Sequence, residues 1–225
     1  MDFEEFVLAA ATGDLADEPA AREHADAVEF RMDHAADPLG DLRDYDGTLP
    51  VIATNRIARE GGETPDTPGR LETLETAIEQ PAVAAVDVEL DAIRDGDAGR
   101  VLDHASAHGV AVVVSAHDFE GTPDRVRMEA LLGAACERGD VGKLAVTAHS
   151  LDETLDLLAA TRAVAGSGSR VATMAMGELG RHSRAVAPVY GSCIGYAPVD
   201  PAEATAPGQY DLETLAGLIE GLGVV

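Results

Sequence analysis

The single lysine of this sequence is the residue whose type and position point most directly to chemistry. Lys143 lies in the apolar run 141–147, which predicts a buried strand, whereas the other 15 basic residues are all arginine. A buried ammonium is costly unless it is paired, and desolvation favours the neutral amine, a nucleophile toward ketones and aldehydes. An ion pair could equally use arginine, but only a primary amine forms an imine. We therefore expect Lys143 to form a Schiff base.

A histidine at the end of the preceding predicted strand is the natural proton-transfer partner. His117 precedes Lys143 by 26 residues, and an imidazole suits general acid–base work near neutral pH. Glu60 could orient this imidazole, as a carboxylate does for a catalytic histidine. The alternatives are a structural histidine and an exposed loop acid.

Arginines at the ends of other predicted strands indicate an anionic, oxygen-rich ligand. Arg31, Arg56 and Arg184 would face one mouth, and arginine binds planar carboxylates through two hydrogen bonds. Asp87 and Glu89 could hold Mg²⁺, but we favour pairing with the arginines or with Lys143. Residues 174 and 176, both methionine, would form an apolar wall.

These residues must be positioned by a repeating pattern of strands and helices. Strands are expected at 6–12, 27–33, 49–55, 84–90, 110–116, 141–147, 170–176 and 189–196, and helices at 69–80, 124–138, 151–164 and 211–222. Eight strand–helix units predict an α/β fold, a single (β/α)8 TIM barrel spanning residues 1–225, with its site at the C-terminal ends of the strands. A doubly wound open sheet is the runner-up, but the turn at 11–15 lacks a GxGxxG phosphate-binding motif.

Charge bounds the partners and the environment. The chain has 41 acidic and 16 basic residues, a net charge of −25, so nucleic acid and anionic membranes are poor partners. The acids are spread along the chain rather than gathered in a tail, which favours adaptation to molar salt, where the Debye length falls to roughly 3 Å. Two cysteines without paired spacing, and no N-terminal signal segment, favour a cytoplasmic location.

In order along the chain, these motifs resemble those of the type I 3-dehydroquinate dehydratases, the Schiff-base enzymes of the shikimate pathway. The resemblance spans 29–209, about four fifths of the chain: E-F-R-M-D, T-N-R-x-x-x-E-G-G, D-V-E, S-x-H-D-F-x-x-T-P, K-L-A-V, M-A-M-G and A-P-G-Q. It implies that Lys143 attacks the C3 ketone of 3-dehydroquinate, and that His117, oriented by Glu60, moves the protons that convert it to 3-dehydroshikimate.

The resemblance also implies the rest of the site and the assembly. Arg184 would bind the substrate carboxylate beside Gln209 and Thr205, a position where many relatives have serine. The remaining implied contacts are the ring-hydroxyl contacts Glu29, Arg31 and Arg56 and the pocket wall Met176. No metal and no diffusible cofactor would be needed, and the protein would be a homodimer. The N-terminal hairpin that closes the barrel bottom in many relatives is expected to be short or missing.

Two other functions remain open from the residues alone. A class I aldolase or transaldolase also uses a strand lysine in this fold, but the order of the motifs argues against it. A catalytically silent binding barrel would have no reason to keep both His117 and a solitary lysine.

Overall fold

Eight parallel strands form the centre of the molecule. The computed structural model describes residues 1–200, 202 and 206–223, and shows the strands in the order β7-β6-β5-β4-β3-β2-β1-β8. Their bounds are β1 (Val7–Thr12), β2 (Ala27–Arg31), β3 (Val51–Thr54), β4 (Val83–Glu89), β5 (Ala111–Asp118), β6 (Val141–Thr147), β7 (Val171–Met176) and β8 (Ile194–Pro198). Nearly all strand residues are buried, as expected for a parallel sheet covered on both faces.

The two ends of this sheet meet, so the strands enclose a near-closed barrel. At the seam between β7 and β8, Val171 pairs with Ser192 in an isolated parallel bridge. The Cys193 N–H donates to the Val171 carbonyl at 2.7 Å, and the Ser192 hydroxyl accepts from the Thr173 N–H at 3.1 Å. The predicted TIM barrel is therefore confirmed, and the open sheet is wrong.

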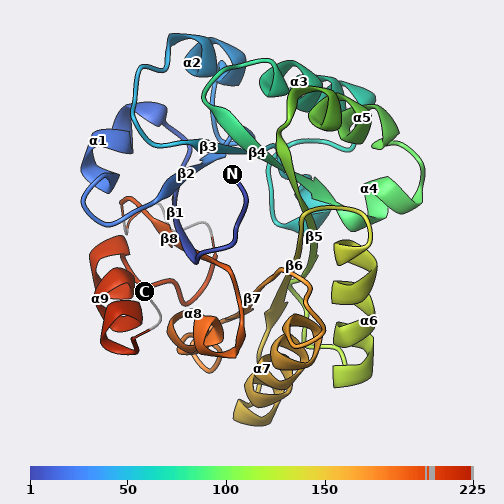
Figure 1. Ribbon diagram of the computed structural model, residues 1–225, viewed down its shortest axis with the longest axis vertical. Coiled ribbons are helices and arrows are strands. Elements are labelled where there is room, and N and C mark those ends of the chain that lie inside the picture. The colour runs from blue at the N-terminus through green and yellow to red at the C-terminus, as the bar shows by residue number, and fades with distance from the viewer. Residues whose placement is uncertain (201, 203–205, 224–225) are drawn as a thin grey trace.

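Helices surround the strands on the outside, as Figure 1 shows. The α-helices are α1 (Glu18–Ala21), α2 (Pro38–Asp44), α3 (Pro68–Ile78), α4 (Leu90–Arg94), α5 (Gly99–His108), α6 (Arg125–Cys136), α7 (Leu151–Ala165), α8 (Ser183–Val186) and α9 (Leu212–Gly221), and the 3-10 turns are η1 (Leu15–Asp17), η2 (Ala58–Glu60) and η3 (Ala187–Tyr190). Asp124, Ser150 and Asp211 begin α6, α7 and α9 by accepting a backbone N–H three residues later.

Alanines mix with larger apolar side chains inside the barrel. Its cluster contains Ala9, Ala27, Ala85 and Ala111, and it also includes Phe3, which is 2% exposed and precedes β1. In Figure 1 the N-terminus lies over the middle of the ring of strands. The N-terminal segment thus packs against the barrel interior through Phe3.

The last strand differs most from the sequence prediction. Strand 189–196 was expected, but residues up to Tyr190 form η3, which has Pro188 in its first turn and ends at Gly191 with φ 104°. Val189 and Tyr190 are 55% and 39% exposed, so their apolar character does not mark a buried strand. The strand begins five residues later than predicted, at Ile194.

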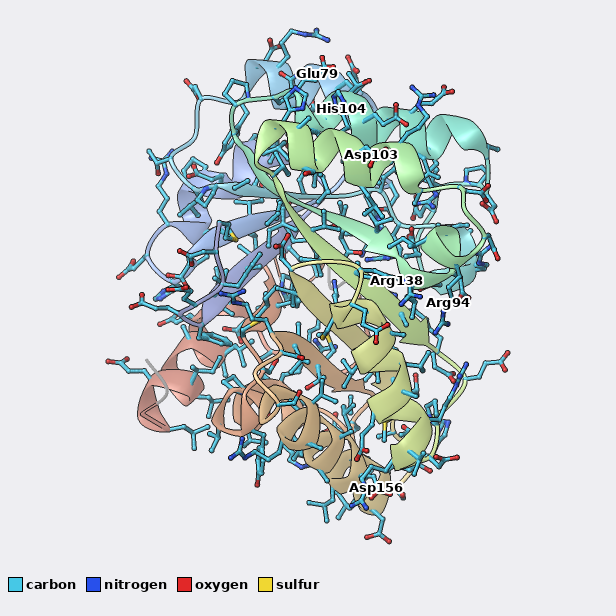
Figure 2. All side chains as sticks on the ribbon, turned by 45° about the vertical axis from the view of Figure 1, so that its right-hand side comes forward. Glu79, Arg94, Asp103, His104, Arg138 and Asp156 are labelled. Atoms are coloured by element: carbon cyan, nitrogen blue, oxygen red, sulfur yellow. The ribbon has the colours of Figure 1, made fainter. Side chains whose placement is uncertain are left out.

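Many of the acidic residues outside the site lie exposed on the outer helices. Figure 2 shows Asp103 on α5 and Asp156 on α7 among the side chains of the outer helices, and both are exposed. No helix in the described part of the chain is long and apolar enough to cross a membrane.

Candidate active site

One cavity at the C-terminal ends of the strands gathers the predicted site residues. It is lined by Glu29, Arg31, Arg56, Glu60, His117, Lys143, Met176, Arg184 and Gln209, which are all of them except Thr205. Thr205 lies outside the described residues. Thr54, Gly61, Phe119, Ala145, Met174, Tyr196 and Ala206 also line the cavity.

The floor of the cavity is a layer of four side chains from the even-numbered strands. Lys143 of β6 lies between two carboxylates, with its Nζ 3.2 Å from Glu29 Oε1 on β2 and 3.0 Å from Asp87 Oδ2 on β4. Tyr196 of β8 completes the layer, and its ring centroid is 4.0 Å from the same nitrogen. Alternate strands contribute such layers in barrels of this type. Glu29, Asp87 and the ring of Tyr196 therefore all contact the Lys143 amine.

His117 and Glu60 form a buried pair beside this amine. Nδ1 of His117 is 2.9 Å from Glu60 Oε2, and the two side chains are 8% and 9% exposed. Burial, with the charges of Arg56 and Lys143, lowers the pKa of His117 well below its ordinary value, so the imidazole is neutral near pH 7. Burial raises the pKa of Glu60 to about 7. When Glu60 is ionised it accepts the Nδ1–H, which leaves Nε2 free to act as a base.

Two glycines that follow Glu60 allow its loop to place the carboxylate beside His117. Gly61 has φ 79°, the left-handed region that glycine adopts without strain. A Cβ at Gly61 would overlap the ring of Phe119, and one at Gly62 would overlap the carbonyl oxygen of Arg56. The E-G-G sequence thus lets the loop fold tightly against β5 and bring Glu60 to His117.

Arg56 lies within a network of carboxylates behind the floor. Its Nη1 donates to Glu89 Oε1 at 3.0 Å and to the Ser115 hydroxyl at 2.7 Å. Its Nη2 is 2.6 Å from Asp87 Oδ1, an ion pair without hydrogen-bond alignment. Although burial alone would raise it, the charges of Arg56 and Lys143 hold the pKa of Asp87 well below its usual range.

The carboxylates Asp87 and Glu89 are therefore occupied by cations of the chain itself. Glu89 also pairs with Arg70 of α3, whose Nη1 lies 2.7 Å from Oε2. The favoured interpretation, pairing with arginines and with Lys143, is borne out by these ion pairs. Within the described residues, no group of three or more His, Cys, Asp or Glu side chains could hold a metal ion.

Arg31 contacts a neighbouring carboxylate in the same way. Its Nε and Nη2 donate to the two oxygens of Asp33 at 2.9 and 2.7 Å. Burial would raise the pKa of Asp33, but the hydrogen bonds and charge of Arg31 lower it. Arg31 therefore lines the cavity as a fixed group.

Arg184 differs from the other cavity arginines because its charge has no counter-ion among the described residues. The side chain comes from α8 and is 4% exposed, and burial lowers its pKa to about 10. Its Nε and Nη2 are buried without a hydrogen-bond partner in the described part of the chain. These two groups form the edge of a guanidinium that binds a carboxylate through two hydrogen bonds. Nearby, Gln209 Oε1 accepts the Ala206 N–H at 3.1 Å.

Sequence reasoning missed four side chains that build this site. Tyr196 lay in the misplaced last strand, although Ile194 and Tyr196 alternate as inward residues should. Ser115 was noticed only as a motif residue, yet its hydroxyl joins Arg56 to Asp87 at 2.5 Å. Phe119 was quoted in the same motif. Arg70 gave no signal, because it lies inside a predicted outer helix.

The arrangement can therefore hold an anion, offer an amine and move protons. One cavity brings together a cation without a partner among the described residues (Arg184), a primary amine (Lys143) and a neutral imidazole (His117).

Comparisons with known proteins agree with this chemistry. The family model described as Type I 3-dehydroquinase matches residues 8–223. The chain is 61% identical over 222 residues to the 3-dehydroquinate dehydratase of Haloarcula marismortui, covering 97% of both chains, and 53% identical over 225 residues to that of Halobacterium salinarum, covering 99% of this chain and 100% of the relative.

Solved structures show the same likeness. The crystal structure of 3-dehydroquinate dehydratase from Geobacillus kaustophilus has a TM-score of 0.84 and 27% identity, covering 98% of this chain and 92% of that one. The type I enzyme of Clostridium difficile, solved with covalently modified comenic acid, has a TM-score of 0.84 and 25% identity, covering 97% and 92%.

Proposed function

This chain belongs to the type I 3-dehydroquinase family, and we propose how its residues dehydrate 3-dehydroquinate. The activity is that of a hydro-lyase of the shikimate pathway, in the Schiff-base class. The geometry of the cavity supports the role that we propose for each side chain. The observation that carries the proposal is that the only lysine stands on the cavity floor beside a neutral histidine.

Substrate binding begins at Arg184. The carboxylate of 3-dehydroquinate accepts hydrogen bonds from its Nε and Nη2, which have no other partner among the described residues. Gln209 lines the cavity, and Met176 forms an apolar wall. The hydroxyl of Thr205, which lies outside the described residues, is proposed as a further contact of the carboxylate. The ring hydroxyls face the polar side of the cavity, where Glu29, Arg31 and Arg56 lie. This orientation brings the C3 ketone to Lys143.

The covalent step occurs at the Lys143 amine. Nζ, after losing a proton to a neighbouring carboxylate or to His117, attacks C3, and the ketone oxygen leaves as water after receiving protons. The resulting protonated imine withdraws electrons from C2. His117 Nε2 removes a C2 proton, and the C2–H electron pair moves to the imine nitrogen as an enamine.

Elimination completes the reaction. The enamine electrons return to form the C1–C2 double bond, and the C1–O bond breaks as His117 gives its proton to the departing hydroxyl. Water then adds to the imine carbon, and 3-dehydroshikimate and the free amine separate. Glu60 stabilises the imidazolium that exists between the two proton transfers, through the 2.9 Å contact to Nδ1.

Borohydride reduction during turnover tests the covalent role. We expect intact-mass analysis to show one substrate- or product-sized adduct on the wild-type chain, and none on Lys143→Arg. Because the chain has one lysine, the α-amine is the sole competing primary amine. A wild-type chain that turns over substrate without a reducible adduct would contradict the proposal. An aldolase would instead form an adduct with a phosphorylated sugar and leave 3-dehydroquinate unchanged.

The assembly and location of the protein are part of the same proposal. We propose that residues 1–225 act as one catalytic domain, in a homodimer, in the cytoplasm. The first turns of the adjacent helices α6 and α7 expose an apolar group that would suit a partner's surface. It consists of Val126, Leu151 and Leu155, which are 74%, 58% and 58% exposed. The free thiols Cys136 and Cys193 suit a reducing compartment. Sedimentation in molar KCl would show a single species of twice the chain mass.

A further inference from the structure

Tyr196 is the one member of the floor layer whose role the reaction above leaves open. Glu29, Asp87 and Lys143 are joined by ion pairs, whereas Tyr196 meets Lys143 only through the face of its ring, 4.0 Å from Nζ to the centroid. The side chain is 4% exposed and lines the active cavity. An aromatic face within about 6 Å attracts a cation without needing any N–H group.

Conversion of the Lys143 ammonium to an imine reduces the number of hydrogen bonds that Nζ can donate. A lysine ammonium has three N–H groups, and those of Lys143 serve Glu29 and Asp87 in the free enzyme. A protonated imine keeps its positive charge but has a single N–H. One of the two carboxylates must therefore lose its hydrogen bond from Nζ once the covalent intermediate forms. The ring contact needs only the charge, so it persists.

We propose that the ring of Tyr196 is a positioning surface that holds the nitrogen of Lys143 in place while it is an imine. The inference rests on the proposed Schiff-base role of Lys143. A planar ring beneath the nitrogen keeps the imine in the barrel centre, with C2 of the substrate turned toward His117. The same face stabilises the positive charge on which proton removal from C2 depends.

The hydroxyl of Tyr196 is not the working group in this proposal. It is buried with no hydrogen-bond partner among the described residues. Burial, together with the charges of Glu29 and Asp87, raises its pKa well above the ordinary value, so it remains neutral. Removing this hydroxyl therefore breaks no hydrogen bond to any described residue, which makes Tyr196→Phe a matched control for loss of the ring.

The test compares Tyr196→Phe with Tyr196→Leu in the full-length protein in molar KCl. We expect Tyr196→Phe to keep kcat within about threefold of the wild type. Tyr196→Leu should lower kcat and the rate of borohydride-trapped adduct formation about tenfold, the size expected for a desolvated cation–π contact, with KM within about threefold. Ile194→Val, on the same strand and in the barrel interior, controls for packing and should leave all three quantities unchanged.

The outcomes separate this inference from the proposed function. A wild-type enzyme without an adduct would contradict the role of Lys143 itself. An adduct that forms equally fast in the wild type and in Tyr196→Leu would contradict only the role of the ring. Equal losses in Tyr196→Phe and Tyr196→Leu would assign the effect to the hydroxyl and also overturn it. If Tyr196→Leu does not fold, Tyr196→Met, of similar length and without a ring, carries the same expectations.

Discussion

Arg56 and Arg184 line the same cavity and are equally buried, at 3% and 4% exposure, yet their surroundings are opposite. Arg56 contacts Asp87 and Glu89, whereas Arg184 has no carboxylate partner among the described residues. Burial alone would lower the pKa of both. The two carboxylates raise the pKa of Arg56 above its ordinary value, while burial lowers that of Arg184 to about 10.

The contrast suggests that one buried arginine serves the stability of the cavity and the other the binding of substrate. A chain with 41 acidic residues could have placed a carboxylate beside any arginine. A buried cation without a counter-ion costs free energy in the free enzyme, and a bound carboxylate returns that free energy. We therefore propose that Arg56 stabilises the floor of the cavity through its ion pairs, and that Arg184 binds the ligand. The next experiments test this division.

The largest expected effect is the loss of kcat on substitution of Lys143, which lies between two carboxylates on the cavity floor. Lys143→Arg keeps a cation between Glu29 and Asp87, so we expect the melting temperature to change by only a few degrees. A guanidinium cannot form the imine, so kcat should fall by about 10³-fold or more. The enone absorbance of the product measures the rate, and a thermal melt measures stability. More than a tenth of the wild-type activity would mean that Lys143 acts only through its charge.

The direct test of the contrast is the pair Arg184→Met and Arg56→Met. Arg184→Met should raise KM about 100-fold without lowering stability, because it removes a buried charge that has no partner in the described part of the chain. Arg56→Met should lower the free energy of unfolding by about 3 kcal/mol, because it leaves Asp87 and Glu89 short of a cation. Steady-state kinetics and urea unfolding in molar KCl measure both. If the stability effects were reversed, the division of roles would be wrong.

The pH dependence of kcat/KM should follow the ionisation of Glu60, the carboxylate that contacts His117. Since the pKa of Glu60 is about 7, its proton is lost as the pH rises through 7, and kcat/KM should rise with it. Below that pH, protonated Glu60 donates to Nδ1 of His117, so Nε2 carries the proton and cannot act as a base.

Glu60→Gln is the matched variant that tests whether Glu60 causes the rise of kcat/KM near pH 7. Its amide oxygen can still accept the Nδ1–H but does not titrate, so kcat/KM should fall about tenfold at pH 8 and lose its rise near pH 7. A profile of the variant that still rises there would assign the rise to another group.

Salt separates the buried charges from the exposed ones. The ion pairs of the floor are screened little, but the exposed acids repel one another across a Debye length that grows from roughly 3 Å at 1 M to 10 Å at 0.1 M salt. We expect the melting temperature to fall by about 10 °C when KCl is lowered from molar to about 0.1 M. An unchanged melting temperature would contradict adaptation to salt.

Much of the fold could be predicted because its signal is local. Seven of the eight strands overlap their predicted ranges closely, and 141–147 matches β6 fully, because buried β-branched runs between helices identify parallel strands. The start of the last strand could not be predicted. An exposed 3-10 turn, Ala187–Tyr190, has the same apolar composition as a strand, and only its surroundings distinguish the two.

The amino-acid sequence by itself determined the types of the reacting groups and the strands that carry them. A single lysine, a histidine one strand earlier and arginines at strand ends suffice to indicate Schiff-base chemistry on an anionic substrate. The period of two along a strand also fixes which side chains point inward.

The tertiary structure alone decided which charges are paired. Arg70 reaches Glu89 across 19 residues, Lys143 reaches Glu29 across 114, and Arg184 reaches no acid in the described chain. Such partners are set by the closure of the barrel and the packing of its helices, which bring side chains from distant elements together. Local pattern therefore identifies the participants, and barrel closure determines which of them remain free to bind substrate.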